Sequence, residues 1–238
     1  MADAELTPKP RNADLPVRFA SGAVMIAIAG IAMWLGVWVF DAFVVLVAAY
    51  TFYEFAGLVR RFARSGGSAL AWLVFGAMYI GLAACVLILV ESKIVLLVII
   101  AVVVLVDSFA YAFGRTIGGP KIAPRISPSK TWAGLFGGIV GATLALIGYY
   151  AFGAAHHGVA SYPVSEYVML IVPGILLAVV AQSGDFFESW MKRRAGVKDS
   201  SNLIPGHGGV FDRTDGLIPV TLAFGAAMLI LAPHQLSL

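Results

Sequence analysis

The sequence has little cysteine and little charge, and both scarcities restrict the kind of protein it encodes. Its 238 residues include one cysteine, Cys85, so no disulfide can form within the chain. Only 12% of the residues are Asp, Glu, Lys or Arg, against about 25% in a typical soluble domain. Hydrophobic residues make up 60% of the chain. The composition is therefore that of an integral membrane protein.

Long polar stretches are scarce as well. The longest is the interval around 182–215, which leaves no room for a separate soluble domain. Residues 1–16 are polar and contain proline, and no small-residue cleavage site of a signal peptide follows them. The net charge of +3 comes from basic residues that form no single face or tail, so no nucleic-acid partner is predicted. We predict one membrane-embedded domain over residues 1–238.

Apolar segments long enough to cross a bilayer predict an all-α, polytopic membrane protein with about seven helices. They cover about Val17–Trp38, Ala42–Val59, Leu70–Val90, Ile94–Phe113, Trp132–Phe152, Tyr167–Phe187 and Leu217–Ala232. If the N-terminus is cytoplasmic, only Lys93 of the 16 Lys and Arg residues lies outside, as the positive-inside rule requires. The odd number of spans then puts the C-terminus outside. The same topology puts the polar segments 107–131 and 182–215 on the cytoplasmic face, where they can share one site.

A stripe of polar residues runs along the end of the sixth predicted span. Gln182, Asp185, Ser189 and Lys192 follow one another at steps of three, four and three, which puts them on one face of a helix. An acid, a hydroxyl and a base in this order suit a phosphate substrate that is bound through a metal ion. We therefore predict that this stripe carries the chemistry.

The loop that follows the stripe adds a second acid and a glycine pair. Asp185 and Asp212 are the best metal candidates, because Mg²⁺ needs only a few carboxylates together with substrate phosphate oxygens. Gly208 and Gly209 let the backbone turn tightly and approach a phosphate. For His207, a structural and a catalytic role both stay open. Three bases are expected to neutralise phosphate charge, namely Lys192, Arg193 and Lys198.

Asp107 lies at the inner end of the fourth span. With Tyr111 and Arg115 it lines one helical face at intervals of four. A carboxylate at this depth is costly unless it is paired or bound to a cation, so it either pairs with a nearby Arg or contacts a ligand or metal. Glu54, at the inner end of the second span, is expected to have a structural role, bracing the site or pairing with Arg60 or Arg61.

The segment before the fifth span contains Ser127, Lys130 and Thr131. Hydroxyls, free N–H groups and an ammonium at the start of a helix form a good anion site, although they also fit a helix N-cap with a topology-setting lysine. The spacing of a Walker loop is absent. Four glycines follow, which predict close packing between helices: Gly134, Gly137, Gly138 and Gly141.

The residues from 189 to 215 resemble the signature of the phosphatidate cytidylyltransferase (CDP-diacylglycerol synthase) family. The matching pattern is Ser189-x-Met191-Lys192-Arg193-x4-Lys198-Asp199-x-Ser201-x2-Ile204-Pro205-x-His207-Gly208-Gly209-Val210-x-Asp212-Arg213-Thr214-Asp215. Other motifs of the family resemble Gly184-Asp185, Asp107-Ser108-x-Ala110-Tyr111-x-x-Gly114 and Ser127-Pro128-x-Lys130-Thr131-Trp132. The chain has fewer predicted spans between Arg64 and Asp107 than many members, so the helix count and any homodimer contact stay open.

The resemblance implies that CTP and phosphatidate, a membrane lipid, give CDP-diacylglycerol and pyrophosphate. It implies Mg²⁺ and a second cation such as K⁺, held at the positions of Asp185 and Asp212. The residues assigned to catalysis are Asp107, Asp185, Lys192 and Asp212. The residues assigned to substrate binding are Ser127, Lys130, Thr131, Ser189, Arg193, Lys198, His207, Gly208, Gly209 and Arg213.

Three alternatives stay open at this stage. A related enzyme would use CTP on another lipid, such as an isoprenoid-ether phosphate or a polyprenol. An ion-coupled transporter is the alternative of another class, although the acids gather at one face and no inverted repeat is visible. A catalytically inactive scaffold is the third. The simplest location is a bacterial inner membrane with the site at its cytoplasmic face, and a eukaryotic organelle stays open.

Overall fold

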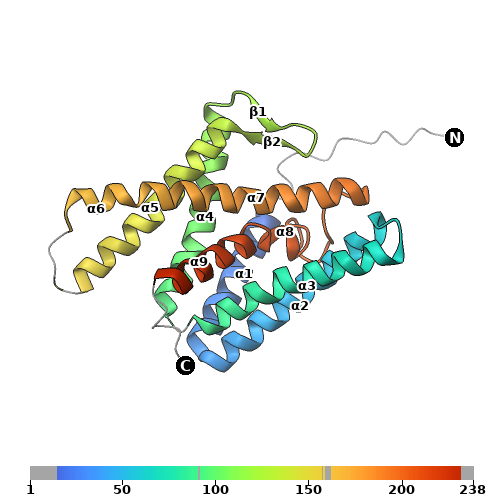
Figure 1. Ribbon diagram of the computed structural model, residues 1–238, viewed down its shortest axis with the longest axis horizontal. Coiled ribbons are helices and arrows are strands. Elements are labelled where there is room, and N and C mark those ends of the chain that lie inside the picture. The colour runs from blue at the N-terminus through green and yellow to red at the C-terminus, as the bar shows by residue number, and fades with distance from the viewer. Residues whose placement is uncertain (1–14, 91, 157, 159–161, 232–238) are drawn as a thin grey trace.

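The computed structural model describes residues 15–90, 92–156, 158 and 162–231 (Figure 1). Most of the polar N-terminal segment 1–16 and both chain ends lie outside the described residues, and so do the predictions about the side of the membrane on which each end lies.

The described chain is helical apart from one small hairpin and several loops. The helices are α1 (Leu15–Leu35), α2 (Val37–Phe62), α3 (Gly66–Leu89), α4 (Lys93–Thr116), α5 (Trp132–His156), α6 (Val164–Met169), α7 (Ile171–Ala195), α8 (Phe211–Thr214) and α9 (Leu217–Leu231). The strands are β1 (Lys121–Ala123) and β2 (Ser127–Thr131), which pair antiparallel.

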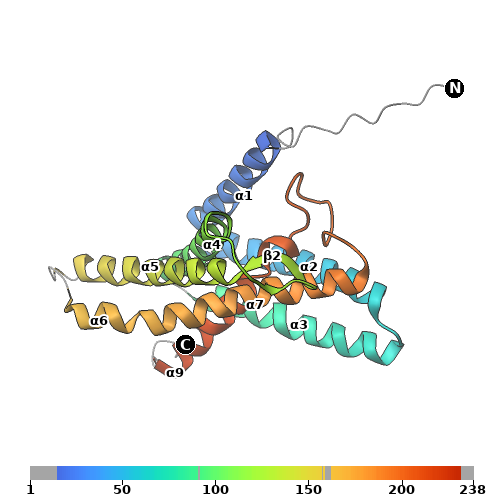
Figure 2. The same ribbon diagram turned by 90° about the horizontal axis from the view of Figure 1, so that it is seen from above.

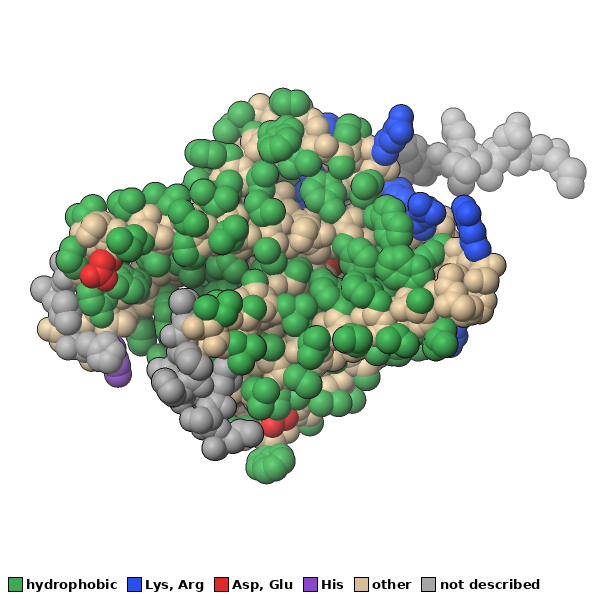
Figure 3. Space-filling model, viewed as in Figure 1, with side chains coloured by type: hydrophobic (Ala, Val, Ile, Leu, Met, Phe, Trp, Pro, Cys, Tyr) green, Lys and Arg blue, Asp and Glu red, His purple; other side chains and the backbone are tan. Residues whose placement is uncertain are grey.

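Among the described residues, five helical stretches are long and apolar enough to cross a membrane, and they confirm an α-helical membrane protein. They are α2, α3, α4, α5 and the continuous stretch Val164–Ala195 formed by α6 and α7. Helices α1 and α9 are apolar but shorter, so the first and last of the seven predicted spans stay predictions. Apolar side chains cover most of the surface visible in Figure 3, as expected for a surface that faces lipid.

Several predicted boundaries differ from the structure by a few residues, and two of them have a clear physical meaning. The first span was predicted to reach Trp38, but α1 ends at Leu35 and α2 begins at Val37. Gly36 makes this abrupt turn at a φ of 120°, a conformation that glycine adopts more readily than other residues. The sixth span was predicted to end at Phe187, whereas α7 continues to Ala195 and carries the whole polar stripe on one helix.

The hairpin is a departure from the all-α prediction. Gly118 and Gly119 have φ values of 68° and 92°, which stop α4 from continuing. Pro120 then cannot donate to a helix, and its carbonyl accepts instead from the N–H of Trp132, at 3.2 Å. Strand β2 leads directly into α5, whose Gly134 N–H donates to Thr131 Oγ1 at 3.0 Å. The predicted helix start is therefore correct, but the residues before it form a strand.

Two apolar clusters hold the helices together. One joins α4, α5, α7 and α9 around Ile99, Val102 and Ala178. The other joins α2, α3, α7 and α8 and is rich in aromatic rings, with Phe55 and Phe211 fully buried. Helix α7 belongs to both clusters, and Figures 1 and 2 show it crossing the molecule between the α4–α5 pair and the α2–α3 pair. Its polar stripe is therefore held from both sides.

The glycines of α5 allow a close helix contact, as predicted, and the partner is α4. A Cβ on Gly141 would lie 2.4 Å from the backbone oxygen of Leu105, and one on Gly137 would lie 2.4 Å from that of Phe109. Gly141→Ala should therefore push α5 away from α4 and destabilise the protein by about 1–3 kcal/mol, because overpacking strains neighbouring backbone.

The measurement for Gly141→Ala is the unfolding temperature of the detergent-purified protein. Gly148→Ala is the matched control on the same helix, because nothing lies within 4 Å of a Cβ there. The control should leave stability unchanged or slightly raised. If the two variants unfold at the same temperature, the close contact between α4 and α5 is not needed for stability.

Candidate active site

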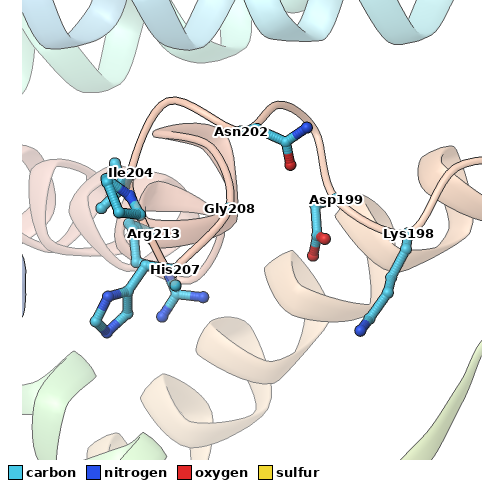
Figure 4. Close-up of a pocket in the computed structure, with 9 residues that line it drawn as sticks. Lys198, Asp199, Asn202, Ile204, His207, Gly208 and Arg213 are labelled. Atoms are coloured by element: carbon cyan, nitrogen blue, oxygen red, sulfur yellow. The ribbon is translucent and has the colours of Figure 1, made fainter. Parts of the chain in front are cut away.

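Two adjoining pockets lie where the polar stripe of α7 meets the hairpin and the loop after α7. The smaller, of about 300 Å³, is lined by Asp107, Ala110, Tyr111, Ser129, Lys130, Thr131, Gly134, Gln182, Asp185, Asp212, Arg213 and Asp215. The larger, of about 600 Å³, is lined by Lys198, Asp199, Asn202, Ile204, Pro205, Gly206, His207, Gly208 and Arg213 (Figure 4). Arg213 belongs to both pockets, which makes them parts of one site.

Asp185 forms an ion pair with Lys130 in the smaller pocket. The two side chains come from α7 and β2, so the pair ties the hairpin to the stripe. Burial alone would lower the pKa of Lys130, but the neighbouring carboxylate of Asp185 outweighs burial, and the pKa is raised above its ordinary value. Lys130 is therefore a fixed positive charge at the edge of the pocket.

Asp212 is held by a dense set of donors. Lys192 Nζ lies 2.6 Å from Asp212 Oδ1 and 2.5 Å from Glu188 Oε2, so it bridges the two acids. The N–H groups of Ser200 and Gly209 donate to Asp212 Oδ2, each at 2.8 Å. Burial would raise the pKa of Asp212, but hydrogen bonding by Glu188, Lys192, Ser200 and Gly209 outweighs it, and the pKa falls below its ordinary value. Asp212 is therefore a carboxylate at neutral pH.

Asp107 faces the same pocket and forms no ion pair within the described residues. Arg115, the base predicted on its face, instead donates to Tyr111 Oη at 2.5 Å and lies over the Tyr111 ring. Asp107 therefore does not pair with Arg115, and its contact with a ligand or metal stays a prediction. The carboxylate is left facing the cavity.

Asp215 is an acid of the pocket that the predicted site did not include. Burial raises the pKa of Asp215 well above its ordinary value, and the charges of Asp185 and Glu188 raise it further. Asp215 thus takes up a proton more readily than an ordinary aspartate. Its position three residues after Asp212 was visible in the sequence, but its burial was not.

Glu54 fastens the loop after α7 to α2, which confirms a structural role. Its buried carboxylate accepts hydrogen bonds from the N–H groups of Val210 and Phe211, at 3.1 and 2.7 Å, and from Ser201 Oγ, at 2.5 Å. Ser200 Oγ lies 2.8 Å from Glu54 Oε2 and 2.7 Å from Asp212 Oδ2, so this hydroxyl bridges the two acids. Glu54 therefore supports Asp212 indirectly.

The glycine pair is required by this packing. Gly208 has a φ of 82°, and a Cβ there would lie 2.9 Å from Asp212 Oδ2. A Cβ on Gly209 would lie 2.1 Å from Ser200 Oγ and 2.4 Å from Glu54 Oε2. At these two positions the backbone lies against the carboxylates of Asp212 and Glu54, and only glycine leaves room for this approach.

The predicted substrate-binding residues fall into four groups. Lys130 and Thr131 line the smaller pocket, Lys198, His207 and Gly208 line the larger, and Arg213 lines both. The remaining four line neither pocket: Ser127, Ser189, Arg193 and Gly209.

Two of these residues have contacts that indicate other tasks. Arg193 Nε donates to the carbonyl of Ile126 at 3.4 Å, so it supports the hairpin. His207 Nδ1 lies 2.7 Å from Ser21 Oγ, which connects the loop to α1. The ring of His207 thus has a structural contact and also lines the larger pocket, as Figure 4 shows.

The pocket has the donor set of a magnesium site that the substrate would complete. In the described part of the chain, no three His, Cys, Asp or Glu side chains are arranged to hold a metal by themselves. Asp185 and Asp212 open onto one pocket, however, and Glu188 Oε1 is buried without a hydrogen-bond partner. Mg²⁺ commonly takes one or two carboxylates together with substrate phosphate oxygens. The residues fit such an ion.

A membrane-embedded helical bundle that gathers acids, lysines and a glycine-rich loop at the end of its spans defines an enzyme for phosphate-bearing substrates. The chain belongs to the cytidylyltransferase family, which matches residues 66–231. The match covers α3 to α9 and therefore both pockets. It leaves out α1 and α2, so the brace from Glu54 comes from outside the matched segment.

Individual relatives agree with this assignment. The chain is 31% identical over 211 residues to the phosphatidate cytidylyltransferase of Rickettsia typhi, covering 85% of this chain and 86% of that protein. It is 33% identical over 212 residues to that of Rickettsia bellii, covering 87% and 88%. With the phosphatidate cytidylyltransferase of Brucella abortus the identity is 41% over 152 residues, covering 62% of this chain and 53% of the relative.

Proposed function

We propose that the protein transfers a cytidylyl group from CTP to phosphatidate, giving CDP-diacylglycerol and pyrophosphate. The observation that carries this proposal is the pair of pockets joined at Arg213, in a chain of the cytidylyltransferase family. Lys130 lines the smaller pocket, and Lys192 is paired with Asp212, which lines it too. One pocket is large enough for a nucleotide beside the glycine-rich loop. The other lies against the helices that would contact lipid.

The reaction joins two anions, so their repulsion is the main barrier that the site must offset. A phosphate oxygen of phosphatidate attacks the α-phosphorus of CTP. A new P–O bond forms while the bond to the β-phosphate oxygen breaks and pyrophosphate leaves in line. Lys130, Lys192 and Arg213 offset negative charge on the reacting phosphates. The lipid phosphate is itself the nucleophile, so no side chain needs to attack or to remove a proton.

The lysines of the site have a second task. Lys130 pairs with Asp185 and Lys192 pairs with Asp212. Asp185 and Asp212 would hold Mg²⁺, and the two ammonium groups would then be available to the substrate phosphates. Mg²⁺ supplies positive charge between the two reactants when it is bound. A second cation such as K⁺ beside these carboxylates, and a contribution of Asp107 to the same cluster, belong to the proposal.

The proposed setting is a bacterial inner membrane with the site at the cytoplasmic face. Figure 3 supports one basic side, because the visible Lys and Arg side chains gather near the hairpin and the C-terminal end of α7. Seven spans with a cytoplasmic N-terminus, an outer C-terminus, one catalytic domain over residues 1–238 and a homodimer complete the proposal. Phosphatidate then reaches the site along the apolar helices, and CTP reaches it from water.

The proposed activity can be tested with the purified protein, labelled CTP and phosphatidate in mixed micelles. CDP-diacylglycerol and pyrophosphate should form in equal amounts. Isoprenoid-ether phosphate and polyprenol serve as competing acceptors. A labelled product from one of these, and none from phosphatidate, would replace the proposed substrate.

Removal of divalent cations should stop the reaction. EDTA should lower turnover at least about a hundredfold, because the charge between the reactants is then missing, and Mg²⁺ should restore it. Initial rates with and without EDTA give the measurement. Full activity in EDTA would rule out the Mg²⁺ site at Asp185 and Asp212 and leave the cytidylyl transfer itself standing.

A further inference from the structure

Gln182 has an unusual position in the smaller pocket. Its side chain is 3% exposed, and neither Oε1 nor Nε2 has a hydrogen-bond partner among the described residues. A Cβ on Gly138 of α5 would lie 3.0 Å from Nε2 and 3.3 Å from Cγ1 of Val106 of α4, so the amide faces small and apolar groups on this side. A buried amide without partners is unfavourable, and such groups usually serve a ligand or water. Gln182 lines the pocket, so a ligand can reach it.

The position of Gln182 along α7 indicates which part of a ligand it meets. The basic residues of α7 are at its C-terminal end, and the helix before Gln182 is apolar. Gln182 precedes Asp185 by three residues, or about 4.5 Å along the axis, on the side of the apolar core. Phosphates held at the level of Asp185 and Lys130 would thus have Gln182 just beneath them, toward the lipid.

The pocket proposed for the nucleotide lies at another level. It is lined by Lys198, His207 and Arg213 and is built from the loop that follows the C-terminal end of α7. The part of phosphatidate that follows its phosphate toward the membrane is the glycerol backbone with two ester carbonyls. Those carbonyl oxygens accept hydrogen bonds, and the NH₂ group of a glutamine carries two donors.

Resting on the proposed function, we propose that Gln182 Nε2 donates to an ester carbonyl of phosphatidate and thereby selects ester-linked over ether-linked lipid. An ether oxygen in place of the ester leaves no carbonyl there, so the buried amide stays unpaired when an ether lipid binds. A site built around a hydrogen bond discriminates against the analogue that lacks it. Oε1 can accept from a water molecule that accompanies the headgroup.

The test compares dioleoyl phosphatidate with its dialkyl ether analogue of equal chain length, using the full-length protein in mixed micelles. The wild type should use the ester about tenfold better in kcat/KM. Gln182→Leu should lose about tenfold with the ester, change less than about twofold with the ether, and keep its KM for CTP. Gln182→Met has an unbranched side chain without a donor and should show the same changes with the ester and the ether as Gln182→Leu. It replaces Gln182→Leu in the test if the leucine variant does not fold. Ser183→Ala, at the exposed neighbouring position, is the control.

The outcomes separate this inference from the proposed function. A wild type that turns over both lipids equally would overturn ester selection alone. Gln182 variants whose kcat/KM falls by the same factor with both lipids would overturn it as well. A raised KM for CTP in these variants would also overturn it, because the amide would then contact the nucleotide. If the wild type makes CDP-lipid from neither substrate, the proposed function fails and this inference fails with it.

Discussion

Asp212→Asn is expected to lower CTP-dependent turnover about a thousandfold, and Asp185→Asn is expected to do the same. Asp212 accepts from Lys192, from Ser200 and from the N–H of Gly209. An amide there would point an NH₂ group at one of these donors and would no longer carry the charge that holds a cation. Losing a single group that stabilises transition-state charge costs about 10²–10³ in rate, and these acids serve the cation and the lysines together.

The measurement is the rate of labelled CDP-diacylglycerol formation by equal amounts of purified protein. Asp41→Asn is the control, because this acid lies at the opposite end of α2 from Glu54 and lines neither pocket. The variants should remain in the membrane fraction in normal amounts, because the spans are untouched. Turnover within tenfold of the wild type from either variant would remove that residue from the proposed cation site.

Features that depend on local sequence were predictable. The length of an apolar run decides whether a helix can cross a membrane, and the spacing of polar residues along that helix decides which share a face. The stripe from Gln182 to Lys192 is therefore one face of α7, as predicted. The close approach of α4 and α5 followed from the glycines by the same reasoning. The residues of the signature that line the pockets were predictable too, because they follow one another in a single segment of the chain and can be recognised without knowledge of the fold.

Features that depend on contacts between distant segments were not predictable. Lys130 is 55 residues from Asp185, and no local pattern indicates that they pair. The alternation of Pro and Ser before Trp132 indicates neither strand nor helix strongly, and the hairpin forms because two strands close on each other. Glu188 differs from these residues, because its contact with Lys192 is local. A spacing of four along a helix is typical of an ion pair, so the sequence held a signal for this contact.

Glu54→Ala should lower turnover about a hundredfold although Glu54 lines neither pocket. Its carboxylate accepts from the N–H groups of Val210 and Phe211 and contacts the hydroxyls of Ser200 and Ser201. Alanine would leave these donors buried without a partner, at a cost of about 1–3 kcal/mol for each unsatisfied group. The loop would move to find other partners. Asp212, which shares Ser200 with Glu54, would then lose its fixed position, and misplacement of about 1 Å can cost 10²-fold in rate.

A positioning role for Glu54 has a signature that separates it from a catalytic one. Lys198 is already exposed, and a loosened loop should fit the trypsin cleft more easily. Glu54→Ala should therefore be cleaved after this residue faster than the wild type or Asp41→Ala. Glu54→Gln keeps one acceptor oxygen and should fall between the two in both activity and cleavage rate. The KM for CTP should rise, because Lys198, His207 and Gly208 line the larger pocket. Wild-type trypsin resistance and an unchanged KM for CTP in Glu54→Ala would show that the loop holds its shape without α2, and that the matched segment from residue 66 onward builds the site alone.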